Sequence, residues 1–297
     1  MRTSYSLAAA LCAAACLLPG ASAQGVATDN LPDETFVRAA GQNIQPFYEG
    51  WQRFPDGHIA MWFGYLNRNY QEQVDVPIGA DNKFDLKPDL GQPTHFYPRR
   101  SLFVFKVDLP NDWPQEKRLV WTVAAHGKAS QASGWLQPEW EVDNGVIQMN
   151  LGTGGAPPEN PPNSAPSISL NADTTAVAGK ALRLSASLKD DGIPKARKRP
   201  APPAGQAPPP PPMLPPGAAP KPRAMLGLRV RWILYRGPDS GGEVSFEEDS
   251  SKPVVGATEA QAATEAVFSK PGAYWLRAIA TDGMLETPYD LKVTVIR

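Results

Sequence analysis

The sequence has 297 residues, with 29 Lys or Arg against 30 Asp or Glu, and this near-neutral balance excludes the basic field that nucleic-acid binding needs. Its two cysteines, Cys12 and Cys16, both lie in the first 23 residues, so the remaining chain has no disulfide framework and no cysteine nucleophile. No stretch approaches the ~20 consecutive apolar residues of a membrane-spanning helix.

Residues 1–23 have the pattern of a secretory signal peptide. Arg2 supplies a positive start, residues 7–18 are an apolar run, and Ala21-Ser22-Ala23 precedes the expected cleavage site. We therefore expect an exported protein, periplasmic or extracellular, whose mature chain begins at Gln24.

The next 17 residues, 24–40, are polar without periodicity and predict a flexible leader. Residues 41–150 then predict an all-β, tryptophan-rich domain organised around a hairpin. Its second arm, residues 59–66, is apolar on both faces, as expected of a central strand, and Pro55-Asp56-Gly57 forms the turn before it. Further strands are expected at 74–78, 101–109, 118–125 and 135–142.

Two proline-rich tracts follow this domain. Residues 151–166 predict a semi-rigid linker, and residues 192–224, which contain 13 prolines, predict a disordered insert. Apolar and polar residues alternate on both sides of the insert, and residues 167–297 predict a second sandwich with strands at 182–188, 228–235, 243–246, 263–268, 273–281 and 289–296. The expected fold class is all-β, with two β-sandwich domains.

Residues 270–278 read KPGAYWLRA and lead to a Thr-Asp-Gly turn at 281–283. This segment resembles the penultimate strand of PKD-type and related bacterial immunoglobulin-like domains. The resemblance places Tyr274 at the tyrosine corner, Leu276 where an antibody-type domain carries its second cysteine, and Trp232 at the strand C tryptophan. Such domains serve as spacers, adhesion modules and carbohydrate-binding modules, so the resemblance implies a fold rather than one function.

The first domain resembles the N-terminal part of uncharacterised secreted bacterial proteins that contain a G-W-x-R-x-P-D-G…F-G-Y-x-N-R-N pattern. Here the two halves of the pattern occupy residues 50–57 and 63–69. This resemblance implies no activity.

Two groups of residues in the first domain are candidate ligand-binding residues. Trp113, Trp135 and Trp140 lie in turn-like sequence beside Gln, Asn and Glu, a combination that favours stacking on a polysaccharide; the alternative is that these rings cover the ends of the sandwich. Arg99 and Arg100 follow aromatic residues in an expected loop and could bind an acidic group, or could simply be solvated.

A calcium site is the candidate in the second domain. Asp190, Asp191 and Asp282 precede glycines in two expected turns that could meet at one end of the sandwich, where their oxygens would suit calcium. Each turn is also an ordinary Asp-Gly turn signal. No other cofactor is predicted.

The three histidines, His58, His95 and His126, lack metal-ligand spacing, and no catalytic residue is predicted. The favoured function is a non-catalytic binding or structural module of the bacterial cell envelope or exterior, whose partner is a polysaccharide or another envelope protein. The alternative is a secreted hydrolase in which His95 or His126 meets a carboxylate such as Asp89, Glu139 or Glu141.

Overall fold

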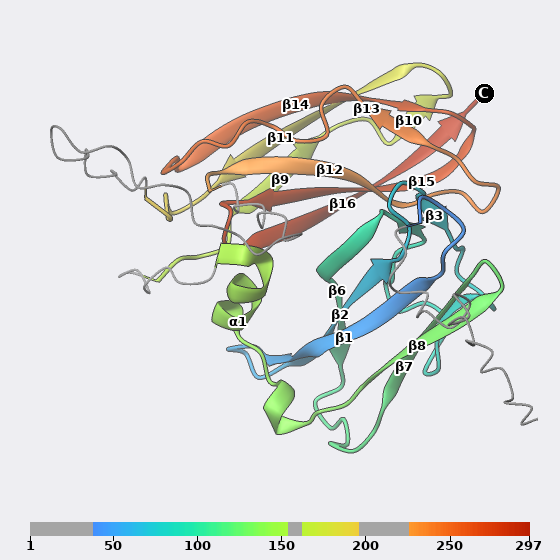
Figure 1. Cartoon of the computed structure of the whole chain (residues 1–297). Helices are drawn as coiled ribbons and strands as arrows, with labels where there is room; N and C mark the ends of the chain where they lie inside the picture. The colour runs from blue at the N-terminus through green and yellow to red at the C-terminus, as the bar shows by residue number, and fades with distance from the viewer. Residues whose placement is uncertain (1–37, 154–161, 196–225) are drawn as a thin grey trace, which may run out of the picture. The chain divides into compact units, whose positions relative to one another are not determined.

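The computed structural model describes residues 38–153, 162–195 and 226–297 (Figure 1). The predicted signal peptide, most of the predicted leader, half of the predicted linker and most of the predicted insert lie outside these residues. The chain from Arg38 to Arg297 forms one compact unit. Strands dominate the described residues, which confirms the all-β fold class.

The expected hairpin is the centre of the first sandwich. Strand β1 (Ile44–Arg53) pairs antiparallel with β2 (Ile59–Asn67), and β6 (Arg99–Leu109) pairs with the other edge of β2. The prediction of a central strand is confirmed. Gly57 makes the turn possible because its φ of +88° is a conformation that side chains with a Cβ rarely adopt.

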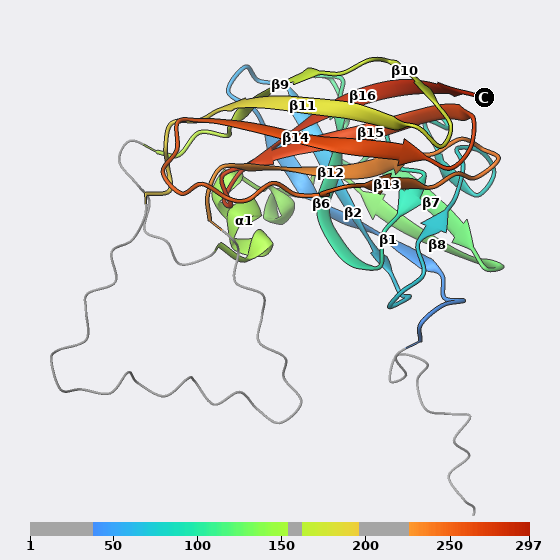
Figure 2. The same cartoon turned by 90° about the horizontal axis from the view of Figure 1, so that it is seen from above.

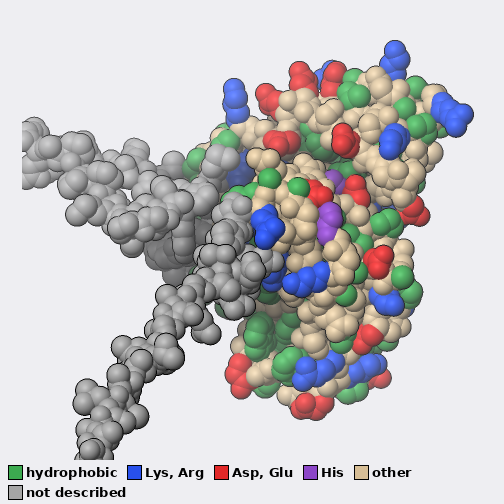
Figure 3. Space-filling view, turned by 45° about the vertical axis from the view of Figure 1, so that its right-hand side comes forward, with side chains coloured by type: hydrophobic (Ala, Val, Ile, Leu, Met, Phe, Trp, Pro, Cys, Tyr) green, Lys and Arg blue, Asp and Glu red, His purple; other side chains and the backbone are tan. Residues whose placement is uncertain are grey.

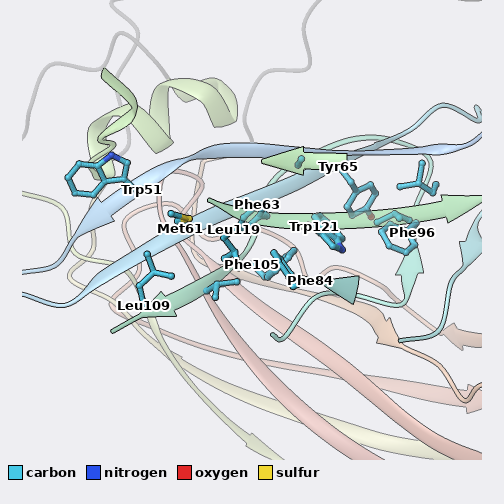
Figure 4. Close-up of a cluster of buried hydrophobic side chains, with 14 of the residues drawn as sticks. Trp51, Met61, Phe63, Tyr65, Phe84, Phe96, Phe105, Leu109, Leu119 and Trp121 are labelled. Carbon is cyan, nitrogen blue, oxygen red and sulfur yellow. The ribbon is translucent and has the colours of Figure 1, made fainter. Parts of the chain in front are cut away.

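A second layer faces this sheet. Strand β7 (Leu119–Ala125) lies between β4 (Asn82–Phe84) and β8 (Lys128–Gly134), and β3 (Val74–Asp75) pairs with β5 (His95–Phe96). Between the layers, Phe63, Phe84, Phe105 and Trp121 meet with ring centroids 5.1 to 6.2 Å apart. Figure 4 shows these side chains within the core. Packed aromatic rings of this kind stabilise the core through buried apolar area and edge-to-face contacts.

The prediction of strands at 135–142 is wrong. This segment holds a short 3-10 helix, η3 (Pro138–Trp140), followed by helix α1 (Asn144–Gln148) and a wider turn, η4 (Met149–Thr153). Pro138 favours the helical start because it has no N–H to donate to a sheet, and Asp143 caps α1 by accepting from Val146 N. The last strand of the first sandwich is β8. The sequence did not predict it, because its small and polar residues show little apolar alternation.

Residues after the linker form an immunoglobulin-like sandwich of two four-stranded sheets (Figure 2). One sheet has the order β10-β16-β15-β12 and the other β13-β14-β11-β9. Their bounds are β9 (Ser167–Asn171), β10 (Thr175–Val177), β11 (Ala181–Lys189), β12 (Arg229–Arg236), β13 (Val244–Phe246), β14 (Glu259–Phe268), β15 (Gly272–Thr281) and β16 (Glu286–Ile296).

The residues that carried the family resemblance occupy the expected places. Trp232 and Leu276 are buried in the core between the two sheets. Tyr274 Oη donates to Lys270 O at 2.8 Å, so its hydroxyl bonds the backbone a few residues upstream, as a tyrosine corner does. Ile193 and Pro194, at the start of the predicted insert, are buried as well.

Candidate functional site

Strand β12 of the second sandwich contacts the first sandwich along the segment that leads into β5. Tyr235 Oη donates to Gly91 O at 2.6 Å, and Thr94 N donates to Tyr235 O at 3.2 Å. Arg236 donates hydrogen bonds to both carboxylate oxygens of Asp89 at 2.8 and 2.9 Å. The Arg236 guanidinium lowers the pKa of Asp89 to about 2, because it hydrogen-bonds the ionised form. Backbone and side-chain bonds together therefore join the two sandwiches.

A second contact lies at Arg277 on β15, whose side chain is buried. Its guanidinium pairs with both oxygens of Asp290 at 2.7 and 3.0 Å and donates from Nη1 to Val104 O of β6 at 2.9 Å. It also lies 3.5 Å from the centroid of the Tyr235 ring. Because one guanidinium satisfies groups on β6, β12 and β16, it couples the two cores through a buried charge.

We call the contacts of Tyr235, Arg236 and Arg277 with the first sandwich the junction. A polar hollow of about 400 Å³ opens beside it. The first sandwich contributes Gln73, Asp75, His95 and Tyr97 to its lining, and the second contributes Leu234, Glu243 and Val244. His95 is 7% exposed, with Nδ1 2.7 Å from Asp75 Oδ1 and Nε2 2.8 Å from Gln73 Oε1. Tyr97 Oη accepts from Leu234 N at 2.9 Å, which ties the lining of one sandwich to the other.

The predicted platform of three tryptophans is not formed. Trp113 is 7% exposed and packs in the first core, so its ring face is unavailable to a ligand. Trp135 is half-buried with the guanidinium of Arg118 over its ring at 4.3 Å. Trp140 is 45% exposed and stacks on Tyr48 with centroids 5.5 Å apart. One ring of the three, Trp140, is thus clearly open to a ligand.

The two candidate arginines are engaged with the protein itself. Arg100 Nη2 lies 2.6 Å from Glu49 Oε1, and its Nη1 donates to Tyr65 O at 3.2 Å. Burial raises the pKa of Glu49, although the charge of Arg100 opposes that rise. Arg99 lies over the Tyr70 ring at 4.0 Å. An acidic ligand would have to compete with these contacts, so the arrangement favours a structural role for Arg100.

The three predicted calcium ligands share one end of the second sandwich, where their oxygens accept hydrogen bonds from the chain. Asp282 Oδ2 accepts from Asn163 Nδ2 at 2.8 Å, and Asp191 Oδ2 accepts from Ser164 N at 2.8 Å. Asp190 Oδ2 accepts from Gly192 N, while its Oδ1 is buried without a partner among the described residues. Burial, reinforced by the charges of Asp282 and Asp191, raises the pKa of Asp190 to about 6.

No group of three His, Cys, Asp or Glu side chains in the described ranges has the arrangement of a metal site. The turns themselves explain part of the aspartate geometry, because each carboxylate accepts from a backbone N–H two residues along. Calcium binding at Asp190, Asp191 and Asp282 therefore stays a prediction.

His95 and His126 each meet a carboxylate, but not one of the three named in the hydrolase alternative. His95 pairs with Asp75, and Asp89 pairs with Arg236 instead. His126 Nε2 lies 3.1 Å from Glu72 Oε1 on the surface, and Glu139 and Glu141 are exposed around η3. No sequence pattern selects Gln73, Asp75 and Glu243, because their convergence depends on how β3, β5 and β13 meet.

On the face drawn in Figure 3, acidic and basic side chains are interspersed. No helix in the described parts of the chain is long and apolar enough to cross a membrane.

Comparison with known proteins identifies no family: no protein-family model and no curated protein matches the sequence. Among solved structures, the chain is similar to the D00-D0 domain of intimin, with a TM-score of 0.27 and 11% identity over 86% of this chain and 100% of that chain. It is also similar to the S-layer protein SbsC, with a TM-score of 0.25 and 10% identity over 82% of this chain and 24% of that chain. At these TM-scores the similarity adds nothing to the fold described above.

Proposed function

We propose that this chain is a non-catalytic binding or structural module that works in the bacterial cell envelope or outside the cell. The observation that carries the proposal is the junction, where Tyr235, Arg236 and Arg277 of one sandwich bond the backbone and Asp89 of the other. Two sandwiches held in this way present their loops in a fixed arrangement. A prearranged surface loses less entropy when it binds a partner.

Within this function, we propose that Trp140 forms part of a glycan-binding surface. Its ring is 45% exposed and is supported from one side by Tyr48, whose hydroxyl donates to Trp135 O at 2.7 Å. Gln137, Glu139 and Glu141 flank it and supply polar groups for sugar hydroxyls. An aromatic ring backed by a second ring resists displacement when a sugar stacks on its open surface.

Tryptophan fluorescence tests the glycan proposal when the protein is titrated with a panel of cell-wall and plant polysaccharides. We expect a saturable shift with at least one polysaccharide, and an affinity at least about tenfold weaker in Trp140→Ala, because truncation of a central aromatic contact usually has effects of this size. Met149→Ala is the matched control, since Met149 is 59% exposed and apolar but has no ring.

A protein that binds no polysaccharide of the panel would contradict the glycan proposal and leave a structural or protein-binding role. Equal affinities of Trp140→Ala and Met149→Ala would place the glycan elsewhere on the surface. In either case the proposal for the junction stands, because it is tested separately below.

A further inference from the structure

The hollow at the junction is negatively charged and is built by both sandwiches. Asp75 and Glu243 are its two carboxylates, and they come from β3 and from the residue before β13. Its volume of about 400 Å³ is within the range of small-ligand sites. No Lys or Arg is among its lining residues.

The groups in the hollow differ in how far they are already satisfied. Asp75 holds His95 through Oδ1, yet 41% of the Asp75 side chain is exposed. Glu243 is exposed, and its carboxylate forms no ion pair with any residue that the structure describes. The hollow can therefore offer carboxylate oxygens to a cation without breaking an existing ion pair of Glu243.

An aromatic ring completes the lining. Tyr97 is half-buried, its ring packs against His95 with centroids 4.7 Å apart, and burial raises the pKa of its hydroxyl to about 12. The hydroxyl thus stays neutral at ordinary pH, and the electron-rich ring adds an attraction for cations.

We propose that this hollow binds an organic cation, in the form of an ammonium or guanidinium group carried by a free polyamine or by a basic side chain of a partner protein. Glu243 and Asp75 supply charge-assisted hydrogen bonds to its N–H groups, and Tyr97 supplies a ring for its apolar or charged part. His95 positions Asp75 and does not contact the cation through a free nitrogen, because both ring nitrogens are engaged.

A bare metal ion fits this lining less well than an organic cation. A metal would need a lone pair of His95 or several carboxylates at short range, and the His95 nitrogens face Asp75 and Gln73. An ammonium or guanidinium group needs only acceptors at hydrogen-bond distance. The proposal goes beyond the glycan surface at Trp140 and does not depend on it.

Isothermal titration calorimetry of the full chain tests the proposal with two probes, spermidine and a short peptide that contains one Lys. We expect saturable binding of at least one probe. Tighter binding of spermidine would indicate a free polyamine as the ligand, and tighter binding of the peptide would indicate a side chain of a protein partner. In Glu243→Gln the affinity falls at least about tenfold, which corresponds to about 1.4 kcal/mol. Asp75→Asn weakens binding as well.

Asp112→Asn is the matched control, because Asp112 is an exposed acid in the turn between β6 and β7 and does not line the hollow. Melting temperatures establish that each variant is folded. Glu243→Gln removes no side-chain hydrogen bond or ion pair with the residues that the structure describes, so the test stays valid if Asp75→Asn unfolds. The proposal is overturned if neither probe binds, if Glu243→Gln and Asp112→Asn bind equally, or if calcium chloride at matched ionic strength displaces the probe as effectively as excess spermidine.

Discussion

Replacement of Arg277 by Met tests the coupling between the two sandwiches most locally. Met fills part of the space of the arginine stem but removes the guanidinium, which holds Asp290, Val104 O and the Tyr235 ring. The substitution leaves the Asp290 carboxylate and the Val104 carbonyl without this partner. Both losses lower the free energy of unfolding. The loss of the bond to Val104 O also weakens the contact between the two sandwiches.

The size of the effect follows from burial. Removal of one partner from a buried ion pair usually lowers the free energy of unfolding by 3–5 kcal/mol. The Arg277 side chain is 9% exposed, but that of Asp290 is 29% exposed, so water compensates part of the loss. We therefore expect a decrease of roughly 3 kcal/mol, at the lower end of that range. For a protein of this size, the melting temperature should fall by roughly 6–12 °C.

Thermal and urea unfolding followed by circular dichroism measure this change. Arg183→Met is the control, because Arg183 is exposed on β11 and its replacement should change stability by less than about 0.5 kcal/mol. Arg277→Lys should fall between the two, since Lys keeps the charge but cannot make the bidentate pair. If Arg277→Met is as stable as Arg183→Met, the guanidinium does not couple the cores and the reasoning fails.

Three further predictions concern local packing, pH and calcium. Gly64→Ala should lower the free energy of unfolding, measured by urea titration, by about 1–3 kcal/mol, because a Cβ there would collide with Glu49 Oε1 and Ser101 O. Gly237→Ala is the control. Its Cβ would have no neighbour closer than 3.6 Å, so this variant should be nearly as stable as the native protein. Asp190 has a native pKa of about 6, above its ordinary 3.8, so the native state binds more protons than the unfolded state between these values and stability falls as pH rises through that window. The melting temperature of Asp190→Asn relative to the native protein should therefore rise from pH 4 to pH 7, and a constant difference would refute the assignment. If calcium binds as the sequence predicts, calcium should raise the native melting temperature at pH 7 but not that of Asp190→Asn.

The sandwich cores could be predicted from the sequence because their strands carry clear apolar patterns. Residues 182–188 are apolar at every second position and form β11, and residues 59–66 are apolar on both faces and form β2. The same logic failed where neither pattern is present. Strand β8 has Ala132 and Gly134 as its buried positions, and such small residues give little hydrophobic signal.

The candidate site was harder to predict because it depends on long-range contacts. The sequence singled out His95 as a possible catalytic histidine but not its partner Asp75, although Asp75 lies in the expected strand at 74–78, of which β3 covers Val74–Asp75. Trp113 was expected in a turn, and it lies there, yet its ring is buried and its Nε1 donates to Lys117 O at 3.1 Å. Turn-like sequence predicts backbone position but not the direction of a large side chain.

Residual dipolar couplings of the backbone amides test the central claim most directly, namely that the two sandwiches are held together as one binding or structural module. In a single alignment medium, couplings from β1 to β8 and from β9 to β16 should fit one alignment tensor. Two tensors that differ in magnitude or orientation would show independent motion of the sandwiches and would contradict the account.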